Sequence, residues 1–496
     1  MYTIFGMGTH WRSFLNRAWF SRLWIVQEAA LATFLEFWCG DVVITHSALS
    51  KAHRILTGSN MLRALSEIGS PLYSTAESGL GIGSHVNIIL LLRVICNPYD
   101  TQSVINMTKL SLRVTSAEPN AGDLLYRMLQ FTSIFHSSDS KDAIFAILPM
   151  VKRTSSLCGC SPLSVIVDYT FSTPAVYHET AKTILVASNN LNLLSYPLDT
   201  SSPNVAGLPS WVPDFSKRSG VSLTQVDYNH TPHFNATHRY YSMPPSFTIK
   251  DAFLECRGYC LGVVEDLGEQ VEDLISGGHF EECARLMLKQ KAIYVTGQGC
   301  VESLWRTLIL DSVEDQYPAP LALAESFHGW LKTVLCRFRA PMYYTPQEVQ
   351  AQMELMPSID LLTKAETDSI IPTLVEIVEQ SKILNELSVV NLAAFREHIR
   401  TCVHDFSAFH LAVTVRANDR RLFRTHNGYL GLGPKSLQIG DSIWILPDAL
   451  VPMAFRTAPS NLANKYRLVG EAYVHGIMHG EAFKNMEPTW ESIVLE

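Results

Sequence analysis

The chain has 496 residues, of which 47% are hydrophobic and 17% charged, and its formal net charge is −8. This composition suffices for roughly two to four folded domains and excludes bulk disorder. The negative charge and the lack of a Lys/Arg-rich run argue against nucleic-acid binding.

The N-terminus shows no basic region followed by an apolar core, so we expect no secretory signal. The longest apolar run, 86–95, is interrupted by Arg93 and is shorter than the ~20 residues that span a bilayer. We therefore expect a cytoplasmic protein without a membrane span. The ten cysteines form no CxxC pair, which favours free thiols. We interpret Cys158-Gly-Cys160 as a plain loop, with a redox or metal pair as the alternative.

A helix is predicted over residues 17–32, because apolar residues recur there at three- and four-residue spacing: Phe20, Leu23, Trp24 and Leu31. Glu28 follows Trp24 by one turn, so both side chains should point the same way. An unpaired buried charge is costly. Glu28 should therefore either pair with a base such as Arg17 or Arg22, or line a cleft.

The next elements are a hairpin and several helices. Two β-rich runs, 34–39 and 42–45, flank Gly40-Asp41, which is typical of a hairpin turn. Helical patterns are found in 47–68, 86–96, 120–150 and 170–188. The Gly-rich stretch 79–83 is not interpreted as a phosphate-binding loop, because no strand precedes it.

Two further segments of this half have residues typical of a particular local structure. Ser138-Asp-Ser-Lys-Asp142 suits a helix start, where side-chain oxygens accept free backbone N–H groups. The proline-bounded segment 208–216 cannot be a central strand, and we interpret it as a hinge. Within it, Trp211 is expected to be a packing anchor between the two halves of the chain.

The second half is predicted to be β-rich with a helical interruption. Strand-like runs occupy 245–265, amphipathic helices follow at 320–338, 359–386 and 390–405, and strands return from 411, beginning with Val413-Thr-Val. We expect the two β-rich segments to pair with each other, since their edges would otherwise be exposed. His404, Asp405 and His410 lie close together, but an ordinary helix end is favoured over a metal site.

Four separated groups of segments resemble the fungal heterokaryon-incompatibility (HET) domain family. They occur in the order found in long proteins of that family: Arg17–Glu28; 139–148; 167–169 with 176–177 and 208–214; and 428–434 with 440–441 and 469–478. Members of the family open with a strand bearing a Tyr-x-x-Leu-Ser-Tyr-x-Trp-Gly-like motif, followed by a Trp-Ile-Asp-Ala-Leu-Cys-Ile-Asn-Gln-like strand. Neither is present here, so we expect an N-terminally truncated HET domain.

The resemblance also implies a chemistry. The HET fold looks like a distant relative of the Toll/interleukin-receptor (TIR) domain, and some TIR domains cleave NAD at the nicotinamide–ribose bond. By that analogy Glu28 is the catalytic acid and Trp24 supports it, with NAD as substrate only and no resident cofactor or metal. A carboxylate held against the ribose would stabilise the positive charge that builds as nicotinamide departs. Glu471, His475 and Glu481 also resemble family positions, and we interpret them as a polar cluster on the barrel rim.

The resulting prediction is an α+β protein in three parts. A partial TIR-like HET domain with a helical surround spans 1–215, a β barrel or antiparallel sandwich is formed by 216–266 and 409–496, and a helical insertion spans 267–408. The predicted function is non-self recognition and programmed cell-death signalling through protein contacts. The expected partners are other HET or NLR-type incompatibility proteins, and self-association is allowed. The alternatives are a NAD glycohydrolase using Glu28, or a catalytically empty remnant.

Overall fold

A computed structural model describes most of the chain. The described residues are 13–15, 17–58, 84–97, 120–196, 205–217, 222–224, 234–238, 247–277, 280–313, 316–337, 372, 375–376, 379, 407–459 and 464–496. They fall into two compact units. Unit 1 comprises residues 1–196 and 202–219, and unit 2 comprises 197–201 and 220–496.

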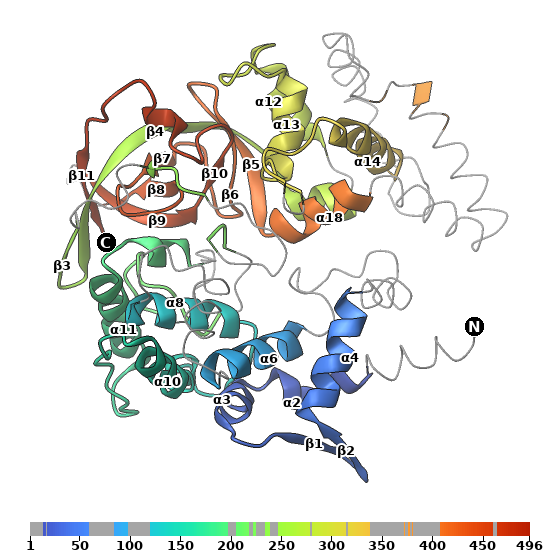
Figure 1. The fold of residues 1–496 in the computed structure, drawn as a ribbon. Coiled ribbons are helices and arrows are strands. Elements are labelled where there is room, and N and C mark those ends of the chain that lie inside the picture. Colours follow the sequence, from blue (N-terminus) through green and yellow to red (C-terminus); the bar gives the residue numbers. More distant parts are fainter. Residues whose placement is uncertain are drawn as a thin grey trace. The chain divides into compact units, whose positions relative to one another are not determined.

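Unit 1 is mainly helical (Figure 1). Its elements are α2 (Ala18–Ser21), α3 (Leu23–Leu31), β1 (Glu36–Cys39), β2 (Val42–Thr45), α4 (His46–Gly58), α6 (Ser84–Cys96), α8 (Ala121–Thr132), α9 (Asp142–Phe145), α10 (Leu148–Cys158), α11 (Thr173–Ser188) and η1 (Asn192–Ser195). The predicted helices at 86–96 and 170–188 are thus confirmed as α6 and α11.

Helix α8 lies at the centre of this unit, and all of its residues are buried. It packs against α10 and α11. Its contact with α11 is close: a Cβ at Gly122 would lie 2.7 Å from the backbone nitrogen of Ser188. A second pair of helices, α3 and α6, also packs together. The core of unit 1 is therefore built from helix–helix contacts.

The predicted hairpin is confirmed as β1 and β2, which pair antiparallel with Trp38 opposite Val43. Gly40 in the turn has φ +62°, a left-handed conformation that glycine adopts without steric cost. This hairpin contains the two strands assigned to unit 1 in the part of the chain that the structure describes. The TIR-like α/β arrangement expected for this half therefore remains a prediction.

Unit 2 contains a β barrel. Its strands are β3 (Thr248–Lys250), β4 (Phe253–Gln270), β5 (Arg420–Thr425), β6 (Leu430–Pro434), β7 (Ser442–Ile445), β8 (Met453–Thr457), β9 (Lys465–Glu471), β10 (Tyr473–Val474) and β11 (Glu491–Leu495). The ladders β4–β11, β11–β9, β9–β8, β8–β7 and β7–β4 return to the starting strand and close the ring. The expected antiparallel arrangement holds except at β9–β11, which is parallel.

Strand β4 takes part in four ladders, one of them with the short strand β3. Its first part pairs with β11, its middle with β7, and its last part with β5, where Gln270 faces Arg421. Irregular register between Cys260 and Gly262, and again between Val264 and Asp266, allows one strand to bend from ladder to ladder. The predicted pairing between the two β-rich segments is confirmed. However, β4 continues to Gln270, beyond the expected end of the segment at residue 266.

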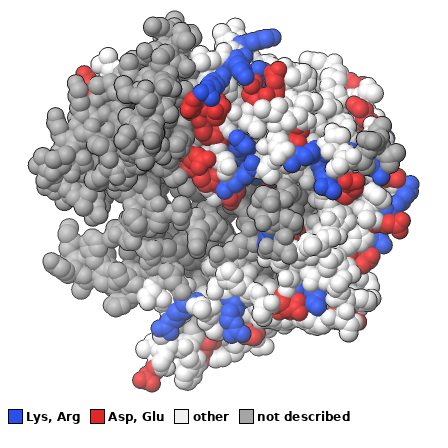
Figure 2. All heavy atoms as spheres, turned by 180° about the vertical axis from the view of Figure 1, so that it is seen from behind, with Lys and Arg blue, Asp and Glu red and all other residues white. Residues whose placement is uncertain are grey.

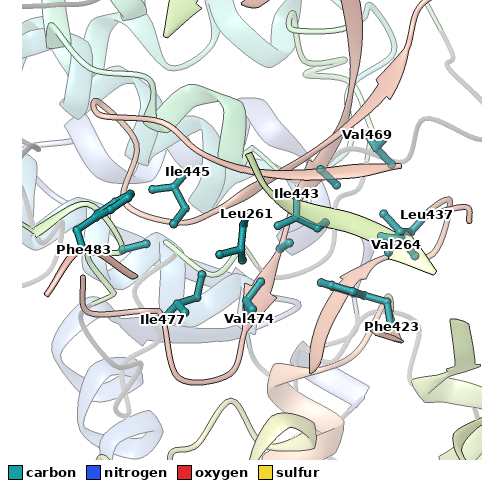
Figure 3. Close-up of a cluster of buried hydrophobic side chains, with 13 residues drawn as sticks. Leu261, Val264, Phe423, Leu437, Ile443, Ile445, Val469, Val474, Ile477 and Phe483 are labelled. Carbon is teal, nitrogen blue, oxygen red and sulfur yellow. The ribbon is translucent and has the colours of Figure 1, made fainter. Parts of the chain in front are cut away.

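Inward-facing residues from these strands and their connections form the barrel core. Figure 3 shows Leu261 and Val264 of β4 together with Ile443, Val474 and Phe423 in one buried cluster. Phe483, from the short helix η4 (Glu481–Phe483), belongs to the same cluster, as does Ile477. The cluster therefore joins residues on both sides of the helical region in the sequence.

That helical region contains η3 (Asp273–Gly277), α12 (Glu281–Leu288), α13 (Cys300–Leu308), α14 (Leu323–Arg337) and α18 (Ser407–Arg416). The helix predicted at 320–338 is confirmed as α14. The prediction of a strand at Val413-Thr-Val is wrong, because these residues lie in α18. There Phe409 packs against Phe327 of α14 at a ring-centroid distance of 5.4 Å. The predicted helices at 359–386 and 390–405 lie almost wholly outside the described residues.

Charged residues of both signs are interspersed on the face shown in Figure 2. Among the helices of the described residues, none is both long enough and apolar enough to cross a bilayer.

Candidate functional site

The segment carrying Trp24 and Glu28 forms two helices instead of the single helix predicted over 17–32. Helix α2 ends at Ser21, and Arg22 is extended, with φ −78° and ψ 132°. The break is caused by an isolated bridge with His136. The N–H of Leu23 donates to the carbonyl of His136 at 2.8 Å, and the N–H of His136 donates to the carbonyl of Ser21 at 2.7 Å.

Trp24 and Glu28 lie one turn apart on α3 but differ in their exposure. It buries five small or aliphatic residues, whereas Trp24 is half-buried and Glu28 is exposed: the buried set is Leu23, Ile25, Val26, Ala29 and Ala30. The interpretation of Glu28 as an acid on the buried face is therefore wrong. No ion pair to Glu28 occurs among the residues that the structure describes. Its carboxylate is accessible, and its catalytic role remains a prediction.

The C-terminal end of α3 is held by Arg93 of α6 and by Asn97, which directly follows α6. The Nη1 atom of Arg93 donates to the carbonyls of Ala29 and Ala32 at 2.7 and 2.6 Å. The side-chain amide of Asn97 donates to the carbonyl of Ala30. The last carbonyls of a helix lack partners within the helix, and a cation there also opposes the partial negative charge of the helix end. Helix α3 is therefore held rigidly on α6.

Trp24 takes part in a half-buried polar junction around the buried carboxylate of Asp142, which connects three of the resembling segments. Its indole Nε1 donates to Oδ2 of Asp142 at 3.0 Å, and the hydroxyl of Tyr169 donates to Oδ1 of the same carboxylate at 2.6 Å. Asp142 itself is only 6% exposed. We call Trp24, Lys141, Asp142 and Tyr169 the Asp142 junction. Sequence reasoning missed Asp142 and Tyr169 as site residues, although both lie within the segments that carry the resemblance.

The loop before Asp142 organises the rest of the junction. The Oδ1 atom of Asp139 accepts the backbone N–H of Lys141 at 2.9 Å, whereas the cap residue of α9, Lys141, makes no side-chain hydrogen bond to the first turn of that helix. The ammonium group of Lys141 donates to the carbonyl of Tyr169 at 2.9 Å and lies 5.5 Å from the centroid of its ring. The hydrogen bond to Asp142 raises the pKa of Tyr169 to about 12. The phenol thus stays protonated and donating across the physiological pH range.

These contacts define what the junction can do chemically. A nucleophile or general base must be able to reach a substrate proton or carbon. Here the indole and the phenol both direct their hydrogens at a buried carboxylate that already has two donors. The arrangement fits a structural tie between α3, the 139–142 loop and the segment near residue 169.

The proline-bounded segment 208–216 is held in place by contacts within unit 1. Trp211 is fully buried, with its ring 5.4 Å from that of His178 on α11. The Oδ1 atom of Asp214 accepts the N–H and the hydroxyl of Ser216, and its Oδ2 accepts the N–H of Val205. Trp211 therefore packs on a helix of its own unit.

A metal site is not supported by the described residues, which contain no group of three or more His, Cys, Asp or Glu able to hold an ion. His410 lies on α18, whereas His404 and Asp405 fall outside the described residues. The Gly-rich stretch 79–83 is outside them as well.

The polar residues predicted at the barrel rim belong to three separate sets of contacts. Glu471 is buried and accepts hydrogen bonds from Arg420, from the N–H of Leu223 at 2.6 Å and from the hydroxyl of Ser222 at 3.0 Å. Glu481 accepts the N–H of His479 at 2.7 Å. Each carboxylate is thus used to hold a neighbouring segment.

His475 forms the third set. Its Nε2 lies 2.6 Å from the side-chain oxygen of Gln298, and its Nδ1 lies 3.1 Å from the hydroxyl of Tyr473. Tyr294 donates its hydroxyl to the carbonyl of His475 at 3.0 Å. Burial, with a smaller effect from Arg306, lowers the pKa of His475 to about 3. The neutral imidazole therefore fastens the turn that contains Tyr294 and Gln298 to the barrel.

The fold and these contacts define a helical unit followed by a unit that contains a β barrel. Residues 387–489 match the family described as the Het-6 beta-barrel domain. The chain is also 26% identical over 506 aligned residues to heterokaryon incompatibility protein 6, OR allele, of Neurospora crassa. That alignment covers 95% of this chain and 65% of the relative, so the chain spans about two-thirds of the length of this curated protein. No solved structure matches the chain.

Both matches confirm the resemblance to the fungal heterokaryon-incompatibility family. The α+β class and the C-terminal barrel are confirmed with it.

Proposed function

We propose that this chain acts in fungal non-self recognition, and that it signals toward programmed cell death through contacts with other proteins. The supporting observation is the relationship to a Neurospora incompatibility protein along 95% of the chain, together with a matching barrel domain. The proposal includes a cytoplasmic location, a TIR-like arrangement of the first unit and HET or NLR-type partners.

The geometry favours contacts over chemistry as the means of action. The Asp142 junction and the Glu471 contacts connect segments of the chain and direct their polar hydrogens inward. In contrast, several large apolar side chains of unit 1 are exposed, among them Trp38 and Ile166. Exposed apolar surface of this kind is typical of protein interaction sites.

Regulated expression in a fungal host tests the proposal. The full chain should arrest growth or reduce viability with at least one incompatible partner strain. A Glu471→Gln variant, which damages the barrel, should lose this effect, whereas Lys250→Gln, at an exposed ion pair, should retain it. An absence of any growth effect across all partner combinations would contradict the proposal.

NAD cleavage is retained as a second candidate because the Glu28 carboxylate is exposed and therefore accessible to a substrate.

A further inference from the structure

One face of helix α4 is buried within unit 1, and two histidines lie on it. His46, Leu49 and His53 follow one another at three- and four-residue spacing, so they share this face. Leu49 is 1% exposed and His53 is 3% exposed. The Nε2 atom of His53 contacts the side-chain oxygen of Asn87 on α6, and since that oxygen can only accept, the imidazole donates. A buried polar contact thus joins α4 to α6.

The first of these histidines lies near a cation that cannot move away. Burial lowers the pKa of His46, and the charge of Arg93 on α6 lowers it further. The guanidinium of Arg93 is fixed in place, because it donates to the carbonyls of Ala29 and Ala32 at 2.7 and 2.6 Å. A proton on His46 would therefore add a second positive charge beside one that is held in position.

The place of His46 in its helix also opposes a positive charge. Helix α4 begins at His46, and the hydroxyl of Thr45 accepts the N–H of Ala48 in its first turn at 3.3 Å. The free N–H groups of a helix give its N-terminus a partial positive charge, so a cation there is unfavourable. The hydroxyl of Ser50, 3.3 Å from Nε2 of His46, carries no charge that could offset it.

The second histidine is disfavoured as a cation mainly by its burial. Burial lowers the pKa of His53, and the hydrogen bond to Asn87 offsets only part of this effect. Apart from the guanidinium already described, the ionisable groups on the neighbouring elements are Glu36 of β1, Asp41 of the hairpin turn and His85 of α6. Neither of these two carboxylates raises the pKa of the two histidines.

We propose that an acid-sensitive contact holds α4 on α6: the helix is docked while His46 and His53 are neutral, and their protonation releases it. Both histidines are protonated more readily in the released helix than in the docked one. Docking is therefore complete above the ordinary histidine pKa of 6.5 and is lost as the pH falls below it. Moderate acidification would thus detach one helix while the rest of unit 1 stays folded. The inference goes beyond the proposed function and does not depend on it.

Hydrogen exchange of the full chain, measured by mass spectrometry between about pH 7.5 and pH 5.5, tests this contact. Exchange times are scaled for the pH dependence of the chemical exchange rate. Below pH 6.5 the protection of α4 should fall by up to about tenfold per pH unit for each histidine. Helix α10, which contains no histidine or carboxylate, should keep its protection.

The double variant His46→Gln/His53→Gln should show α4 protection that no longer depends on pH, since glutamine keeps a donor but does not titrate. If circular dichroism shows that this variant is unfolded, His46→Gln alone should reduce the slope by about half. His238→Gln, at an exposed residue of unit 2, should keep the full pH dependence.

Three results would overturn the proposal. The first is α4 protection that does not change with pH in the original chain. The second is a pH dependence that persists in the folded glutamine variant. The third is an equal loss of protection in α10, which would indicate general acid unfolding in place of the release of one helix.

Discussion

The indole nitrogen of Trp24 donates a hydrogen bond to Oδ2 of Asp142, 118 residues further along the chain, at 3.0 Å. The tryptophan that gives the first segment its resemblance to the HET family is therefore used to fix the second segment. Tyr169 occupies the other oxygen of the same carboxylate. These three side chains of the resembling segments thus have a structural role that requires no reaction.

Replacing Trp24 by phenylalanine should destabilise unit 1. The variant keeps an aromatic ring but leaves one oxygen of a buried carboxylate without its donor, which should cost about 1–3 kcal/mol of unfolding free energy. Urea unfolding measures the change. Trp19→Phe, at a more exposed position of the neighbouring helix, is the matched control. Equal effects of the two substitutions would show that the bond to Asp142 contributes nothing.

Replacing Glu471 by glutamine should cost about 3 kcal/mol or more, because it removes the carboxylate that is paired with the buried guanidinium of Arg420. The exposed pair of Lys250 and Glu255 offers the comparison, and Glu255→Gln should change stability by less than about 1 kcal/mol. Guanidinium unfolding of both variants gives the two values. The buried pair would be unimportant to the barrel if Glu471→Gln proved as mild as Glu255→Gln.

Stability should depend on the protonation of His475. Its pKa is about 3 in the folded chain, against an ordinary value of 6.5, so below pH 6.5 the unfolded chain binds a proton that the folded chain does not. The contribution of neutral His475 to the free energy of unfolding is therefore complete above pH 6.5, and it is lost as the pH falls toward 3. The difference between the original chain and His475→Gln, measured by thermal unfolding across this window, isolates the effect. A difference that does not vary with pH would refute it.

Gly431→Ala should disrupt the barrel more than Gly433→Ala. A Cβ at residue 431 would lie 2.3 Å from the carbonyl oxygen of Tyr473 and 2.4 Å from the ring of Phe423, neither of which can move easily. At residue 433 the nearest atom is the end of the Leu437 side chain at 2.8 Å, which can adjust. We expect overpacking costs of about 3 kcal/mol and about 1 kcal/mol, respectively. Melting temperatures in the reverse order would contradict the packing described for β6.

Glu28→Ala should leave stability within about 0.5 kcal/mol of the original value, since the side chain is exposed. A loss of activity in this variant would therefore report on catalysis and not on unfolding. If Glu28 is the catalytic acid, purified chain incubated with NAD should release nicotinamide, and Glu28→Ala should not. Release that is no greater than in the variant removes the glycohydrolase candidate.

Local pattern predicted much of the fold. Three- and four-residue spacing located α6, α11 and α14, and turn residues located the hairpin around Gly40. The pairing of two distant β-rich segments also followed from the need to cover their edges. Val413-Thr-Val was wrongly assigned to a strand, because a short β-branched run has the same local signature in a buried helix.

The candidate site was less predictable, since its geometry depends on contacts between distant segments. Helical spacing placed Trp24 and Glu28 on one face. It could not show that a bridge between Arg22 and His136 divides the predicted helix, so that a second helix begins at Leu23. No local sequence pattern predicts that Asp142 accepts hydrogen bonds from Trp24 and Tyr169. Burial of Glu28 was inferred from its apolar neighbours, although one exposed position is normal on an otherwise buried helix.

The ladder position at which Gln270 faces Arg421 has a consequence for how this architecture can vary. The chain departs from the barrel at the end of β4 and comes back beside its point of departure, as in an ordinary hairpin whose loop has been greatly enlarged. Because the entropy of closing a loop grows only slowly with its length, such an excursion can expand or contract between relatives while the barrel stays intact. A shortened version with a tight turn after Gln270 would keep every ladder of the ring.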